Sequence, residues 1–195
     1  MADEPAAIGR TCGACRLCCK LFPLPVLEKA AGQWCRFVSR QGCSIHNGGR
    51  PQVCREYACY WLDHVYLPEW YRPDRLAIVV TDWGHVAVGG ELLRVLLFHQ
   101  SHRLASGRAK AQAMLADVIA RDMVAMLVCG QEVEIVYDRV RYPSLSAREI
   151  EVALRYEQSQ GAEELRRRGV VAADFRPLTR AEAEALVEAE GRRRG

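Results

Sequence analysis

Cysteine clustering is the feature that most constrains this chain. The chain has nine cysteines, and all but Cys129 fall between residues 12 and 59. Half of this group stands in one short run, Cys12-Gly-Ala-Cys15-Arg-Leu-Cys18-Cys19. Thiols this dense are typical of either a disulfide framework or a metal site.

The sequence favours metal over disulfides. Its N-terminal residues lack the positively charged start and apolar stretch of a secretory signal. No run of apolar residues is long enough to predict a membrane span. We therefore expect a cytoplasmic protein, in which thiols stay reduced and a cysteine cluster binds metal. The adjacent Cys18 and Cys19 would also form a strained disulfide.

Composition and patterning predict an α+β protein. At 195 residues, with half of them hydrophobic, the chain is long enough for a small metal module fused to a second unit. We expect a disordered N-terminus over residues 1–9 and a cysteine-cluster metal-binding module of loops and short helices over 10–70. A small α+β unit, an antiparallel sheet with a packed helix, is expected over 71–142, and a charged helical tail over 143–195.

Hydrophobic periodicity predicts the elements of the 71–142 unit. Apolar residues recur at helical spacing over 107–128, so this segment predicts the packed helix, with an Asp117–Arg121 ion pair outside and Gly130 as its cap. Alternating apolar and acidic residues predict a half-buried strand over 133–137. The other expected elements are a strand over 76–80, a hairpin turn over 82–85, a strand over 86–88 and a strand or helix over 92–98.

Capping patterns predict helices in the C-terminal tail, and the charge pattern bears on which partners the chain can bind. Ser146 with Glu149 and Thr179 with Glu182 predict two helix starts. The tail mixes acidic and basic residues, which predicts a solvated helix surface. The net charge of +3 is too small a basic excess to predict nucleic-acid binding. An unknown protein partner remains open, and no membrane association is expected.

The spacing of the cysteines indicates which kind of metal centre they could bind. Cys12, Cys15 and Cys18 offer three ligands from one loop, so at least one distant cysteine, Cys54 or Cys59, should complete their site. The later gaps are irregular and give no second Cys-x2-Cys knuckle, which zinc ribbons use. We therefore favour an iron–sulfur cluster, with Zn²⁺ as the open alternative. Cys129 is expected to be a buried small hydrophobe.

Basic residues accompany the thiols. Between residues 12 and 59 they outnumber acidic residues, which offsets the negative charge of a thiolate-bound metal and predicts lowered thiol pKa values. We expect Arg50 and Arg55 to donate hydrogen bonds to the cofactor's sulfur atoms. His46 has ligand spacing from Cys43, but a packing role is favoured for it.

Taken in order, these residues closely resemble the CxxCxxCC family of zinc- or iron-chelating domains, the YkgJ-type cysteine cluster proteins. The likeness covers residues 12–61 and rests on the adjacent cysteines, the Cys43-Ser-Ile-His46 step and the Arg50-Pro51-Gln-Val-Cys54-Arg55 step. The resemblance implies a metal-binding protein, often described as iron–sulfur-containing. It implies metal-ligand positions at Cys12, Cys15, Cys18, Cys19, Cys35, Cys43, Cys54 and Cys59.

Three functions follow as expectations. The first is an iron–sulfur protein with a redox or cluster-related role and no identified substrate. The second is a zinc-stapled interaction module without catalysis. The third is a methyltransferase-like enzyme, because one branch of the family resembles the longer flagellin lysine N-methylases. The chain has no Gly-x-Gly-x-Gly cofactor loop, and Gly89-Gly90 alone is a weak signal, so enzyme activity stays open.

Overall fold

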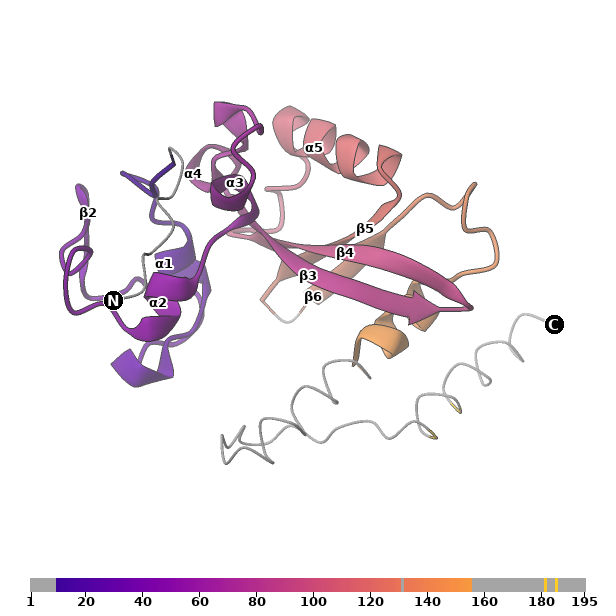
Figure 1. The fold of residues 1–195 in the computed structure, drawn as a ribbon, viewed down its shortest axis with the longest axis horizontal. Coiled ribbons are helices and arrows are strands. Elements are labelled where there is room, and N and C mark those ends of the chain that lie inside the picture. Colours follow the sequence, from indigo (N-terminus) through magenta and orange to yellow (C-terminus); the bar gives the residue numbers. More distant parts are fainter. Residues whose placement is uncertain (1–9, 131, 156–180, 182–184, 186–195) are drawn as a thin grey trace, which may run out of the picture.

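The computed structural model describes residues 10–130, 132–155, 181 and 185. The expected disorder of residues 1–9 and the helix start at Thr179 lie outside them. Short elements at the N-terminal end lead into a sheet with one long helix above it, so the α+β class is confirmed (Figure 1). The sheet has the order β3 (Ile78–Val88), β4 (Glu91–Gln100), β5 (Met123–Cys129) and β6 (Glu132–Val136), and the long helix is α5 (Ala109–Ala120).

The cysteine module, residues 10–76, contains only short elements. Two of its helical turns begin with a proline, whose fixed φ suits the first turn of a helix. Its strands pair as a small antiparallel hairpin. In chain order the elements are α1 (Cys18–Leu21), η1 (Pro25–Leu27), β1 (Val38–Ser39), β2 (Gly42–Cys43), α2 (Gln52–Glu56), α3 (Tyr60–Asp63), η2 (Glu69–Tyr71) and α4 (Pro73–Leu76).

The main sheet is mixed, so the expectation of an antiparallel sheet was wrong for one pair of strands. β3–β4 and β5–β6 are antiparallel, whereas β4 and β5 run parallel. The reason is the position of α5 between them. A helix that crosses over the sheet returns the chain to the end at which β4 began, and the next strand then runs in the same direction.

The predicted hairpin turn over residues 82–85 was also wrong. β3 continues through this segment, and a register shift between Asp82 and Gly84 marks a bulge. The turn lies at Gly89–Gly90, whose φ angles are 58° and 87°. Two consecutive residues with positive φ form the turn that best matches the twist of a two-stranded hairpin, and glycine adopts it without strain.

The helix predicted over residues 107–128 ends early. α5 stops at Ala120, Asp122 takes a left-handed φ of 61°, and the remaining apolar run becomes β5. A short apolar run fits a buried strand as well as a helix, and here pairing with β4 decides the outcome. Gly130, expected to cap the helix, instead has a φ of 62° between β5 and β6.

The two faces of the sheet pack against different partners. Alternate residues of a strand face opposite sides. Leu96 and Phe98 of β4 belong to the core that includes α5, which lies over that face. Leu93 and Val95 face the other way and pack with the segment that follows β6. The bulge in β3 changes its alternation, so Val86 pairs with Leu93 on this second face.

The segment after β6 ends in a helix over residues 147–155. The predicted capping box is confirmed: Ser146 N–H donates to Glu149 Oε2 at 2.7 Å, and Glu149 N–H donates to Ser146 Oγ at 3.1 Å. Leu145 and Ile150, on either side of this start, are both buried in the second core. The box therefore fixes the angle at which the helix packs on the sheet.

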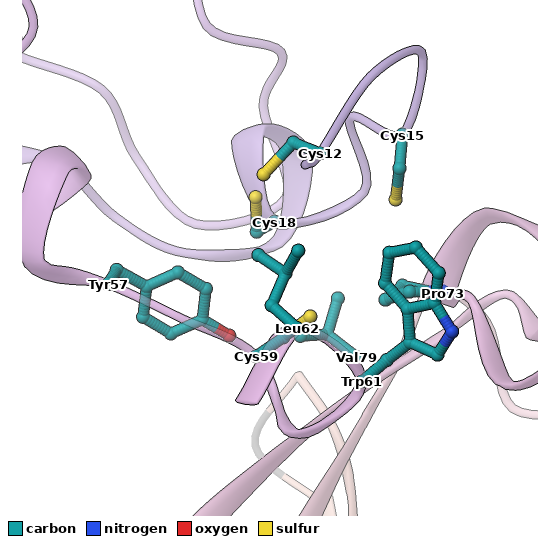
Figure 2. Close-up of a pocket in the computed structure, with 9 residues that line it drawn as sticks. All are labelled: Cys12, Cys15, Cys18, Tyr57, Cys59, Trp61, Leu62, Pro73 and Val79. Atoms are coloured by element: carbon teal, nitrogen blue, oxygen red, sulfur yellow. The ribbon is translucent and has the colours of Figure 1, made fainter. Parts of the chain in front are cut away.

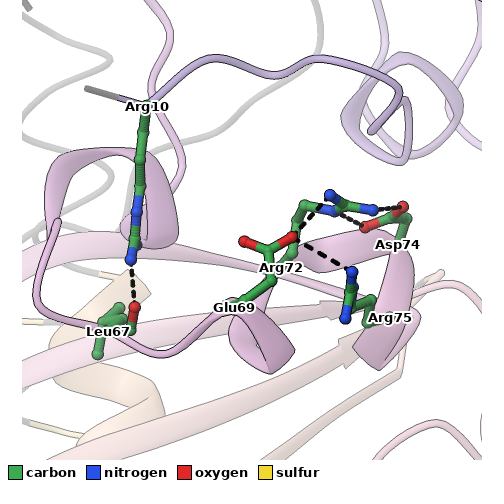
Figure 3. A network of polar contacts seen from close by, with 6 residues as sticks. All are labelled: Arg10, Leu67, Glu69, Arg72, Asp74 and Arg75. Atoms are coloured by element: carbon green, nitrogen blue, oxygen red, sulfur yellow. Dashed lines mark hydrogen bonds and ion pairs between the residues drawn. The ribbon is translucent and has the colours of Figure 1, made fainter.

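An apolar cluster packs the module against the sheet, and Arg10 ties the start of the module to its own later segment. Tyr60 and Trp61 of α3 share a core with Phe98. The Arg10 guanidinium donates to the backbone carbonyls of Trp61 (2.8 Å), His64 (3.0 Å) and Leu67, and lies 4.6 Å from the centre of the Trp61 ring. Figure 3 shows the contact with Leu67. Figure 3 also shows the adjoining ion pairs of Arg72 with Glu69 and Asp74, and of Arg75 with Glu69.

Candidate metal centre

The eight clustered cysteines come from separate short elements of the module. Cys12 and Cys15 stand before α1, in a turn closed by a hydrogen bond from Cys15 N to Cys12 O (2.8 Å). All eight are free thiols. Cys35 and Cys59 are buried, and the other six are half-buried. Cys18 and Cys19 begin α1, Cys35 precedes β1, Cys43 is in β2, Cys54 is in α2, and Cys59 is the N-cap of α3.

A cavity of about 370 Å³ gathers most of these thiols. Its remaining wall is largely apolar and includes Phe22, Leu24 and Ile45, while Thr81 and His99 of the sheet contribute side chains from another direction. A chamber of this kind keeps charged sulfur atoms in surroundings of low polarity. The cysteines that line it are Cys12, Cys15, Cys18, Cys19, Cys35, Cys43 and Cys54.

A second, smaller pocket of about 20 Å³ adjoins the cavity and contains the remaining cysteine (Figure 2). In Figure 2 Cys12, Cys15 and Cys18 lie on one side of this pocket and Cys59 lies on the opposite side, next to Leu62. Tyr57 and Trp61 flank the sulfur atoms and Val79 closes the pocket from the sheet. The three closely spaced thiols share this small pocket with Cys59, and they share the large cavity with Cys54.

The thiols line these walls without meeting at a point. Within residues 10–130 and 132–155, no three Cys, His, Asp or Glu side chains are grouped closely enough to hold a metal ion in the positions they occupy. Thiolate ligands suit both zinc and iron–sulfur clusters. The donor chemistry therefore fits a metal, and binding would have to draw the thiols inward.

Three buried hydrogen-bond donors beside the thiols lack an acceptor among the described residues. They are Arg50 Nε, Tyr57 Oη and Trp61 Nε1. A buried donor without a partner costs about 1–3 kcal/mol. Figure 2 shows the Tyr57 hydroxyl pointing toward Cys59, where a thiolate or sulfide would accept its hydrogen bond. This arrangement fits an anionic sulfur centre better than it fits neutral thiols.

Burial, rather than the basic residues, controls most of the thiol pKa values. It is the largest cause that raises the pKa of Cys12, Cys15 and Cys54, and it raises that of Cys59 to about 11. The expected general lowering was therefore wrong for these four. Cys19 is the exception, because a hydrogen bond from Cys18, followed by the charges of Lys29, Arg16 and Arg50, lowers its pKa to about 7 against the effect of burial.

Lys29 is a buried cation that the sequence did not single out. Its side chain is only 7% exposed, and Nζ donates to the carbonyls of Lys20 (3.2 Å), Phe22 and Ala30 (3.2 Å). The anionic groups that act on it are thiols, those of Cys35 and Cys19 first, and no carboxylate is among the main ones. A buried ammonium is stable only when paired, so Lys29 supplies a fixed positive charge to this side of the cavity.

The two arginines expected beside the metal occupy different places. Arg50 lines the large cavity, and its charge acts on Cys12, Cys19 and Cys54. Arg55 is exposed and donates through Nη1 to the backbone carbonyl of Arg50 at 2.8 Å. Arg55 can thus act on the thiols only through the segment that carries Arg50.

Two histidines line the large cavity from different elements. His46 lines it from the loop after β2, and His99 lines it from β4. His99 Nε2 lies 3.1 Å from Thr81 Oγ1, and its ring meets the edge of Phe22 at 4.7 Å. Burial lowers the pKa of His99 to about 4, so its ring is neutral at pH 7. No sequence signal near the cysteines points to His99 or Thr81, since β-sheet pairing alone brings them to the cavity.

Cys129 lies apart from the other thiols. It ends β5 and lines a separate polar pocket of about 240 Å³ with Gln100, Arg103 and Glu132. Its side chain is half-buried rather than fully buried as expected. Cys129 is therefore a suitable reference thiol for experiments on the others.

Comparison of the chain with protein-family models, curated proteins and solved structures gave no match. Among the described helices, none combines the length and the apolar character needed to cross a bilayer.

Proposed function

We propose that the cysteine module binds a metal centre through its thiolates, and that this centre is an iron–sulfur cluster with a redox or cluster-related role. The observation that carries the proposal is the cavity of about 370 Å³, which collects seven cysteines from distant parts of the chain. Thiols gathered this densely are typical of a disulfide framework or a metal site, and all of these thiols are free.

The size and charge of the cavity favour a cluster over a single ion. One water molecule accounts for about 30 Å³ in the liquid, so the cavity has room for a group of many atoms. A cluster bound by thiolates is anionic. The half-buried Arg50 lines the cavity, and the buried Lys29 lies close to the thiols of Cys35 and Cys19. Apolar walls and hydrogen bonds to sulfur set the reduction potential of such clusters.

The residues of the chain then have distinct tasks. The cysteine thiolates would hold the group, the unpaired donors of Tyr57 and Arg50 would be available to its sulfur atoms, and Phe22 and Leu24 would exclude water. An iron–sulfur cluster supplies one-electron redox chemistry when bound. Reduced thiols are also what a cytoplasmic location would maintain.

A zinc-stapled module is the second candidate, and the small pocket favours it. Four thiols, those of Cys12, Cys15, Cys18 and Cys59, line a pocket of only about 20 Å³. Structural zinc takes four ligands in a tetrahedron, and a site of this kind contributes directly to folding.

Anaerobic purification followed by elemental and acid-labile sulfide analysis tests the two candidates. The iron–sulfur proposal expects iron and sulfide in comparable amounts, together with a broad visible absorption that reduction bleaches. Zinc without sulfide, in a colourless protein, would establish the second candidate instead. Cys15→Ser should lose metal, whereas Cys129→Ser, the matched control outside the module, should retain it. Equal loss in both variants would contradict the assignment of the thiols.

A further inference from the structure

The adjacent residues Cys18 and Cys19 stand at the boundary between two groups of thiols. The near group is Cys12, Cys15, Cys18 and Cys59, which line the small pocket. The far group is Cys19, Cys35, Cys43 and Cys54, which line the large cavity and not the small pocket. Cys59 in turn does not line the large cavity. Each group has four members, and the three cysteines that line both pockets, Cys12, Cys15 and Cys18, are counted in the near group.

Backbone contacts hold the far group together. Cys35 N–H donates to the carbonyl of Cys19 at 3.1 Å, which ties the loop before β1 to α1. Cys43 is paired with Val38 in the β1–β2 hairpin that directly follows Cys35. Arg50 Nη1 donates to the carbonyl of Cys54 at 3.4 Å. These contacts tie the segments of Cys19, Cys35 and Cys43 together, and Cys54 lines the same cavity.

A buried cation lies close to these thiols. Lys29 is buried, and the thiols that act on it are those of Cys35 and Cys19, followed by Cys18 of the near group and then Cys54. A buried ammonium surrounded by neutral thiols would have no counter-charge, and that is costly. Metal-bound thiolates at this position would provide the counter-charge.

We infer that the module contains two adjoining metal centres, one held by the near group and one by the far group, with Cys18 and Cys19 each serving a different centre. The inference rests on the proposed metal-binding function and specifies its ligands. Four thiolates complete either a tetrahedral zinc site or an iron–sulfur cluster. Because Cys18 and Cys19 are adjacent in the chain, the two centres would lie side by side.

Metal analysis of serine variants tests the inference on the full-length chain. Iron, zinc and acid-labile sulfide are measured per chain, after anaerobic purification, in Cys54→Ser, Cys59→Ser, Cys35→Ser/Cys54→Ser and Cys54→Ser/Cys59→Ser. Each single variant should lose one centre and keep the other. The double variant within the far group should lose no more than Cys54→Ser alone. The double variant across the groups should lose nearly all metal, and Cys129→Ser should lose none.

The contrary outcomes are distinct. Complete loss of metal in Cys54→Ser and in Cys59→Ser alike would mean one shared centre and would overturn the partition while leaving the proposed function intact. Full retention of metal in Cys54→Ser would show that the far group does not hold a metal centre. A wild-type chain without bound metal would overturn both proposals. Far-ultraviolet circular dichroism checks that each variant folds, and Cys43→Ser replaces Cys54→Ser in the series if the latter does not.

Discussion

Single side chains around the thiols determine how firmly a metal would be held. Arg50 has a buried Nε without an acceptor among the described residues, whereas Arg55 is exposed and bonds only to the Arg50 backbone. Arg50→Ala should therefore weaken metal retention by about 10- to 100-fold, the usual effect of losing a hydrogen-bond donor beside a metal ligand. Competition with a coloured chelator measures this loss.

Arg55→Ala is the matched control for this change, because it removes the same charge from a nearby exposed position. We expect it to retain metal almost as well as the wild type. Arg50→Lys should rescue retention only in part, because lysine lacks the planar guanidinium fork. Wild-type retention in Arg50→Ala would show that this arginine does not contact the centre.

His99 makes stability depend on pH. Its pKa in the folded protein is about 4 and its ordinary value is 6.5, so between these values the unfolded chain binds a proton that the folded chain does not. The free energy of unfolding should therefore fall as the pH drops from 6.5 to 4, by up to about 3 kcal/mol. Urea denaturation at several pH values measures the decline.

His99→Gln should flatten that decline, since glutamine does not titrate and can still hydrogen-bond to Thr81. Loss of metal at acid pH would affect the wild type and the variant alike. The difference between their free energies of unfolding therefore gives the contribution of His99. Identical pH profiles for the two would refute the assignment.

The sequence could predict the thiols but not all of the side chains around them. Cysteine type and spacing are local properties, and they identified every thiol that lines the two pockets. Lys29 and His99 carry no local signal. The burial of Lys29 depends on three carbonyls that the turn around η1 collects, and His99 reaches the cavity through strand pairing far along the chain.

At the scale of elements, the loop before α1 and the β1–β2 hairpin meet at Gly42. This residue has a φ of 121°, and a Cβ added to it would lie 3.3 Å from the Gly13 carbonyl oxygen. Gly42→Ala should lower the free energy of unfolding by about 1–3 kcal/mol, because alanine is strained at this φ. It should also weaken metal retention, since Gly13 lies between Cys12 and Cys15. Chemical denaturation and chelator competition measure the two effects.

Gly48 provides the control, because it has an ordinary backbone conformation and open space around its Cα. Gly48→Ala should change the free energy of unfolding by no more than about 0.5 kcal/mol. Equal effects of the two substitutions would exclude close packing at Gly42 as the cause.

Helices and strands could be predicted from the sequence where the local pattern was compatible with only one kind of secondary structure. The Ser146–Glu149 capping box and the alternating strand β6 meet this condition, and both formed close to their predicted positions. The run over residues 123–129 fits a helix or a strand equally well, and its pairing with β4 is a long-range contact. The Asp82–Gly84 segment contains residues typical of turns, yet it forms a bulge within a longer strand.

At the scale of the molecule, the order of the patterns was enough to predict an α+β fold, but not the parallel β4–β5 pair. The module and the sheet also differ in what stabilises them. The sheet has two apolar cores, whereas the residues between Cys12 and Trp61 include few that are fully buried. Stripping metal should therefore remove amide protection over residues 12–61 while β3 to β5 stay protected.

Hydrogen exchange with and without a chelator measures this difference. The core strands β4 and β5 serve as the internal reference, because exchange there reports global unfolding. Unchanged protection over residues 12–61 after verified metal removal would show that the module folds without its metal.

The contact of Arg10 with residues 61–67 affects how the module would take up metal. No thiol takes part in this contact, so metal loss does not break it directly. The cysteine-bearing segment then remains a closed loop with both ends anchored, and the entropy of bringing those ends together is already lost before metal arrives. We therefore expect Arg10→Ala to slow the binding of added metal to the stripped chain more than it weakens the binding of metal that is already in place.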